Sequence, residues 1–183
     1  LLLVSVPLVL FLFQINKMIP LPDSFKAMEE QANDAIKALL IMDNAGEFMG
    51  NMLLIALLPA VGEELVFRGV VQQQLMRRIG NPWWALALSA AVFSFFHFQF
   101  EGFLSRVLLG FLLGWLYWET RNFWVPVIAH FFNNGVQVIA QYASNDKNSV
   151  VDLEQDVQVP WFVALLSLFM VLVTMRLIRQ RGS

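Results

Sequence analysis

The chain has 183 residues, of which 58% are hydrophobic and 14% are charged, and its formal net charge is −2. A soluble domain has about 45–50% apolar and about 25% charged residues, so this composition excludes an ordinary water-soluble domain. The chain has no cysteine. Disulfides, thiolate metal sites and a cysteine nucleophile are therefore excluded.

The apolar residues are gathered in long blocks, the length of about 20 residues that a hydrocarbon core roughly 30 Å thick requires. The fold class predicted from this pattern is all-α, a polytopic bundle of transmembrane helices. Seventeen Phe and six Trp suit lipid-facing and interfacial positions. Six spans are predicted, at residues 1–19, 48–76, 81–100, 103–118, 123–142 and 160–178.

Two acidic segments lie between these spans. The first follows span one, and its apolar residues recur every three or four positions, which predicts an amphipathic helix on the membrane surface. These residues are Phe25, Met28, Ala32, Ile36, Leu39 and Leu40. The second segment, "SNDKNSVVDLEQDVQ", separates spans five and six.

The basic residues predict the orientation of the bundle, because cytoplasmic loops carry an excess of Lys and Arg. Arginines follow spans two, four and six, which places both termini in the cytoplasm and both acidic segments outside. Three parts are expected: residues 1–47 with the first span and an acidic amphipathic segment, a core at 48–142, and residues 143–183 with the acidic outer loop, the last span and a basic tail. The arginines are Arg77, Arg78, Arg121, Arg176, Arg179 and Arg181.

Charged residues interrupt the second span in the stretch "GEELVFRG". An ionisable residue at the centre of a transmembrane helix costs about 2.5–3.5 kcal/mol, so such residues are usually paired or functional. Glu64 and Arg68 are four apart and can pair on one helical face. Glu63 points about 100° away and has no such partner. An ion-pair cluster that only holds helices together is the alternative, but the second carboxylate favours a functional site.

Both histidines of the chain are also expected inside spans. His97 follows Phe93 by one helical turn, and His130 precedes Asn134 by one turn. With a rise of about 1.5 Å per residue, these side chains and Glu63 lie within one to two turns of a common depth. The sequence therefore predicts a polar pocket inside the membrane.

Such a pocket has the groups needed for hydrolysis. A carboxylate beside an imidazole can take a proton from water, and amide and imidazole donors can hold the oxyanion that follows. Glu63, His97 and His130 are also of the types that bind catalytic zinc, although no HExxH helix is present. Both readings remain open from the residues alone.

Three motifs in order, "EELVFR", "FSFFH" and "HFFNN", resemble those of the CPBP family of intramembrane proteases. This family includes CAAX-prenyl endopeptidases and bacterial homologues linked to bacteriocin processing or immunity. The resemblance covers about residues 50–140, and the lead-in "RNFWVPVIAH" is similar to bacterial members. It implies a multi-pass protein of the bacterial inner or plasma membrane.

The resemblance implies roles for the motif residues. Glu63 activates water together with His97, while His130 and Asn134 stabilise the oxyanion. The substrate is expected to be a peptide or membrane protein, with or without a prenyl group, in contact with the lipid bilayer. No nucleic-acid partner is expected.

The resemblance also implies that Glu64 and Arg68 organise the site. An intramembrane endopeptidase of glutamate type, without a cofactor, is favoured over a zinc enzyme. A non-catalytic membrane scaffold or bacteriocin-immunity protein on the same fold is the alternative function. A proton-coupled transporter is disfavoured, because no repeat relates the two halves of the chain.

Overall fold

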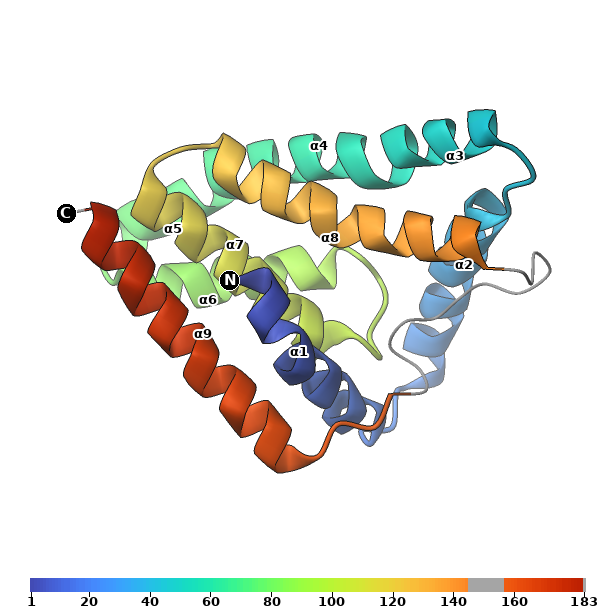
Figure 1. Cartoon of the computed structure of the whole chain (residues 1–183). Coiled ribbons are helices and arrows are strands. Elements are labelled where there is room, and N and C mark those ends of the chain that lie inside the picture. The colour runs from blue at the N-terminus through green and yellow to red at the C-terminus, as the bar shows by residue number, and fades with distance from the viewer. Residues whose placement is uncertain (145–156, 183) are drawn as a thin grey trace.

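The computed structural model describes residues 1–144 and 157–182, and every regular element among them is a helix (Figure 1). This confirms the all-α prediction. The acidic segment predicted between the last two spans lies largely outside the described residues. The helices are α1 (Leu2–Lys17), α2 (Asp23–Leu40), α3 (Ala45–Asn51), η1 (Met52–Leu57), α4 (Leu58–Val66), η2 (Phe67–Val71), α5 (Gln72–Ile79), α6 (Pro82–Phe95), α7 (Phe103–Thr120), α8 (Trp124–Ala143) and α9 (Trp161–Gly182).

The predicted second span forms one unbroken helical run over residues 45–79, in which two π-helical segments flank α4. In a π-helical turn the hydrogen bond spans five residues, which adds one residue to the turn. The first segment, η1, ends just before Pro59. Proline has no N–H to donate to the carbonyl four residues earlier, that of Ile55. The wider turns therefore adjust the backbone on both sides of the helix that carries Glu63 and Glu64.

Helix α7 lies at the centre of the packing, where it contacts α1, α6, α8 and α9. On one side, α1 packs against α7 and α9 (Figure 1). The hydroxyl of Ser167 in α9 donates to the Val4 carbonyl of α1 at 2.6 Å. On the other side, α8 runs along η1 and α4. This arrangement places the charged residues of α4 between α8 and the C-terminal end of α6.

Two glycines let α7 approach its neighbours closely. A Cβ atom on Gly110 would lie 3.0 Å from the Phe93 ring and 3.3 Å from the Cα atom of Ala90. A Cβ atom on Gly114 would lie 2.7 Å from the side-chain oxygen of Gln72 in α5 and 3.0 Å from a methyl group of Leu86 in α6. Small residues spaced four apart are a common device for close helix packing in membranes. The contact of α6 with α7 therefore depends on both glycines.

The prediction of a continuous span over residues 81–100 is wrong at its C-terminal end. Helix α6 ends at Phe95, and His97 lies in the turn that follows. Phe98 adopts a left-handed conformation with φ of 55°, which few L-residues adopt without support. The helix can end here because the free backbone groups of residues 96–102 find partners in distant parts of the chain, as described below.

Length and composition single out one helix among the described residues, Trp161–Gln180, as able to cross a membrane. Helices α1 and α6 are apolar but shorter. Each of the six predicted spans does contain a helix. Among these helices, however, only the last is long and apolar enough to cross a membrane by this criterion.

Gly110→Ala is expected to lower the free energy of unfolding by about 1–3 kcal/mol, because the added methyl group forces α6 and α7 apart. Thermal or denaturant unfolding of the detergent-purified chain measures this change. Gly50→Ala is the matched control, since nothing lies within 4 Å of its added Cβ atom. Equal effects of the two substitutions would show that the close contact at Gly110 contributes no stability.

Candidate active site

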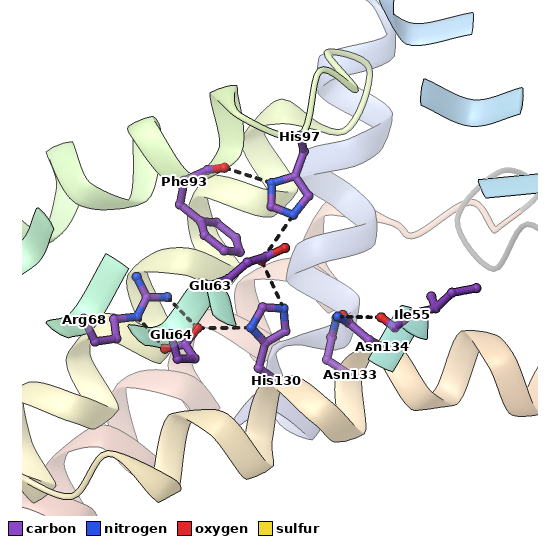
Figure 2. Close-up of polar contacts among 9 residues, drawn as sticks. All are labelled: Ile55, Glu63, Glu64, Arg68, Phe93, His97, His130, Asn133 and Asn134. Atoms are coloured by element: carbon purple, nitrogen blue, oxygen red, sulfur yellow. Dashed lines mark hydrogen bonds and ion pairs between the residues drawn. The ribbon is translucent and has the colours of Figure 1, made fainter. Parts of the chain in front are cut away.

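Glu64 and Arg68 form a fully buried ion pair (Figure 2). The Nε atom of Arg68 donates to Oε2 of Glu64 at 2.7 Å, and Nη2 donates to Oε1 at 3.3 Å. Both side chains have 0% exposure. The predicted pairing at a spacing of four residues is confirmed. The two-point contact holds the carboxylate in one orientation and balances its charge where no water can do so.

His130 is joined to this pair from α8. Its Nδ1 atom lies 3.0 Å from Oε1 of Glu64, and the ring is 2% exposed. A carboxylate only accepts hydrogen bonds, so Nδ1 of His130 carries the proton. The opposite atom, Nε2, is then turned toward Glu63. Glu64 therefore sets the position of the imidazole and holds a proton on its Nδ1 atom.

His97 is oriented in the same way by a different partner. Its Nδ1 atom lies 2.9 Å from the carbonyl oxygen of Phe93, and the two rings are in contact with centroids 4.7 Å apart. Because a carbonyl only accepts, Nδ1 is again the donor and Nε2 is free to face the site. Phe93 also lies against His130 and under the guanidinium of Arg68. The FxxxH motif thus supplies both the imidazole and the ring that supports it.

Glu63 lies between the two imidazoles (Figure 2). Its Oε2 atom is 3.6 Å from Nε2 of His97 and 3.8 Å from Nε2 of His130. These distances are too long for direct hydrogen bonds, and Oε2 of Glu63 is a buried atom without a hydrogen-bond partner among the described residues. The side chain is 30% exposed, in contrast to the buried Glu64. The two adjacent carboxylates therefore have the different surroundings that the sequence predicts.

Asn134 is the one motif residue that the structure does not bring against the carboxylates or imidazoles. Its side-chain nitrogen lies 3.5 Å from the carbonyl oxygen of Ile55 and its oxygen 3.3 Å from Asn133 (Figure 2). The Ile55 carbonyl is the one that Pro59 leaves without its usual helical donor. Asn134 does follow His130 by one turn of α8, so its side chain lies on the same face of that helix.

The turn that carries His97 is held by the N-terminal part of the chain, a contribution that the motifs did not predict. Asn16 of α1 donates to the Phe100 carbonyl at 2.7 Å and accepts from the Leu104 N–H at 3.0 Å. The Asn16 side chain is 5% exposed. A lone asparagine at the end of an apolar span was the available signal, because a buried amide needs partners.

Helix α2 also contacts the turn that carries His97. The backbone N–H of Glu101 donates to both carboxylate oxygens of Glu29, at 3.2 and 3.3 Å. Burial raises the pKa of the Glu29 carboxyl, and the hydrogen bond from Glu101 partly offsets this effect. The Phe25 ring stacks on Phe100 at 4.4 Å, and Gln99 donates to Asn33 at 2.6 Å. The acidic amphipathic helix predicted from the sequence is thus present and contacts the His97 turn.

The same side chains include three of the kinds that bind metal ions. Glu63, His97 and His130 are of the ligand types of catalytic zinc, and both imidazoles are anchored through Nδ1, as metal-binding histidines usually are. Within residues 1–144 and 157–182, however, no group of three His, Asp or Glu side chains is spaced to hold a metal ion. The side chains as placed do not fit a zinc ion.

Comparison with known protein families matches residues 45–136 to the type II CAAX prenyl endopeptidase Rce1-like family. The matched region begins with α3, ends within α8, and contains every residue of the three motifs. The chain belongs to this family. Helices α1, α2 and α9 lie outside the matched region, so the Asn16 and Glu29 contacts come from beyond it.

Two curated proteins of Bacillus subtilis (strain 168) are similar to the chain. One, named "Putative membrane peptidase YdiL", is 29% identical over 108 residues, which are 59% of this chain and 40% of that protein. The other, "Uncharacterized protein YpbD", is 30% identical over 105 residues, which are 54% of this chain and 51% of that protein. The matches thus span about half of these relatives or less. No solved structure matches the chain.

Asn16→Ala is expected to loosen the His97 turn, because it leaves the buried Phe100 carbonyl and Leu104 N–H without partners, at a cost of about 1–3 kcal/mol each. Amide hydrogen exchange of residues 96–104 should accelerate, while exchange in α8 changes little. Gln74→Ala, an exposed substitution on α5, is the control. Unchanged exchange in Asn16→Ala would show that the turn is held without α1.

Proposed function

We propose that this chain is the catalytic core of an intramembrane endopeptidase, in which Glu63 activates water for attack on a peptide bond. The observation that carries the proposal is the position of the Glu63 carboxylate between two imidazole Nε2 atoms. Membership of the CAAX prenyl endopeptidase family supports the reaction class. In this proposal residues 48–142 form the catalytic core, and residues 1–47 and 143–183 flank it.

The first step follows from the hydrogen-bonding capacity of the site. Nε2 of His97 and Oε2 of Glu63 are both acceptors, and they face one another at 3.6 Å. A water molecule has two hydrogens and can donate one to each group, which directs an oxygen lone pair toward a substrate carbonyl carbon. As the new C–O bond forms, Glu63 takes the proton from this water.

Charge balance assigns the role of His130. Two carboxylates and one guanidinium leave a net charge of −1 in the pocket, which a proton on His130 neutralises. The imidazolium donates through Nδ1 to Glu64 and through Nε2 to the oxyanion of the tetrahedral intermediate. Glu64 stabilises this cation but touches no reacting atom, so it is a positioning residue, as is Arg68.

Asn134 provides the second oxyanion donor in this proposal. Its amide bond to Ile55 is long at 3.5 Å and can be exchanged for one to the substrate by a side-chain rotation. The C–N bond then breaks as the proton held by Glu63 passes to the leaving nitrogen. The products are a carboxylic acid and an amine, and Glu63 returns to its ionised form. The acid then passes its remaining proton to the amine or to solvent and leaves as a carboxylate.

We also propose that the chain lies in a bacterial membrane as a bundle of six spans, with both termini in the cytoplasm. Large apolar side chains are exposed along the helical run over residues 45–79, along α8 and along α9, where lipid would cover them. The substrate is a peptide or membrane protein that reaches the site from the bilayer. A prenylated peptide is the first candidate, on the basis of the family.

Glu63→Gln is expected to lower kcat at least about 100-fold, because it removes the base while keeping the shape of the side chain. The assay is cleavage, followed by mass spectrometry, of a farnesylated peptide with a CAAX ending and of a library of unmodified peptides. Glu30→Gln, on the exposed face of α2, is the matched control and should retain full activity. Full activity of Glu63→Gln would exclude this mechanism.

Metal dependence is tested by exhaustive chelation of active protein, followed by metal analysis. We expect activity to persist and the metal content to be far below one ion per chain, because the water is activated by Glu63 and His97. Loss of activity that returns on addition of zinc would instead assign Glu63, His97 and His130 as metal ligands.

A further inference from the structure

A polar pocket separate from the active site lies where α5 and α7 end. Its volume is about 230 Å³. It begins one helical turn beyond Arg68, at the buried Gln72, whose amide donates to the Gly114 carbonyl at 3.0 Å. Neither the proposed hydrolysis nor the motifs use this pocket. The lining residues are Gln72, Gln73, Met76, Arg77, Tyr117, Trp118 and Arg121.

The pocket is rich in hydrogen-bond donors and positive charge. Arg77 and Arg121 both line it and are exposed, and no carboxylate of the described residues forms an ion pair with either. Arg121 ends α7 in a left-handed conformation with φ of 54°, fixed by its N–H bond to the Tyr117 carbonyl at 2.9 Å. The Tyr117 hydroxyl accepts from Gln73 at 3.1 Å, which leaves its own hydrogen to donate to a third group.

The surroundings of the pocket are those of a membrane–water interface. A buried apolar cluster contacts Met76, Trp118 and two residues of α9, Met175 and Ile178, so the C-terminal ends of α5, α7 and α9 meet at one end of the bundle. The cluster consists of Leu86, Trp115 and Leu116. Figure 1 shows the end of α9 near α5 and α6. Trp118 also contacts Trp83, with ring centroids 5.5 Å apart. Tryptophan and arginine together are typical of helix ends at the cytoplasmic surface of a membrane.

We propose that this pocket binds the phosphate group of an anionic phospholipid. Two guanidinium groups and a tyrosine hydroxyl match the oxygens of a phosphodiester, and Met76 and Trp118 offer apolar contact to the glycerol and upper acyl chain. Basic pockets between helices on the cytoplasmic side of membranes are a common form of headgroup site. The inference rests on the proposed membrane placement of the bundle but not on the proposed hydrolysis.

The test uses the full chain purified in a neutral detergent, with native mass spectrometry to count bound lipids. Phosphatidylglycerol is titrated against phosphatidylcholine of the same acyl chains. We expect clear preference for phosphatidylglycerol, and about a 25-fold loss of this affinity in the Arg77→Ala/Arg121→Ala double variant, since each arginine near an anionic surface contributes about fivefold. Glycerophosphoglycerol, the soluble phosphodiester that remains when the acyl chains are removed, should not compete at equal concentration.

The matched control is the double variant Arg78→Ala/Arg179→Ala, which removes two exposed charges from the same end of the bundle without altering the lining. It should retain most of the preference. If both double variants lose the same affinity for phosphatidylglycerol, the lipid is attracted by the general surface charge and does not bind in the pocket. Equal binding of both lipids, or full competition by glycerophosphoglycerol, would overturn the assignment to an anionic phospholipid. Peptide cleavage is measured in parallel and does not enter the test.

Discussion

The positions of the buried polar side chains depend on the contacts of the Glu64 carboxylate. It accepts from Arg68 within its own helical run and from His130 of α8, so it joins two helices through one charged group. Removing one partner of a buried ion pair typically costs 3–5 kcal/mol, because the other charge is left uncompensated. Glu64 can therefore not be exchanged without loosening both the guanidinium and the imidazole. The neighbouring Glu63 does not pair with Arg68, and its side chain is partly exposed.

The two imidazoles are positioned by different parts of the chain. His130 depends on Glu64, inside the region that matches the family. His97 depends on Phe93 for its ring orientation, but the turn that carries it is bound by Asn16 and Glu29 from outside that region. The geometry around Glu63 is thus a joint product of the family core and of the N-terminal helices.

Short-range geometry explains which features were predictable from the sequence. The pairing of Glu64 with Arg68 and the separate direction of Glu63 follow from helical spacing alone, and the helices follow from the apolar blocks. The end of α6 at Phe95 was not predictable, because the partners of the His97 turn lie more than 60 residues away in the sequence. The contact of Asn134 with Ile55 was missed for a similar reason, since it depends on how Pro59 disturbs a different helix.

The π-helical segments on either side of α4 determine the direction in which Glu63 points. Each holds one residue more per turn than an α-helix would, so the whole of α4 is set at a particular rotation relative to the helix before and after it. Tightening η1 to an ordinary turn would swing residue 63 by about 100° and carry its carboxylate away from both rings. Substitutions that displace Glu63 from the imidazoles can therefore arise among Met52–Leu57, a stretch of apolar side chains that contains none of the polar site residues.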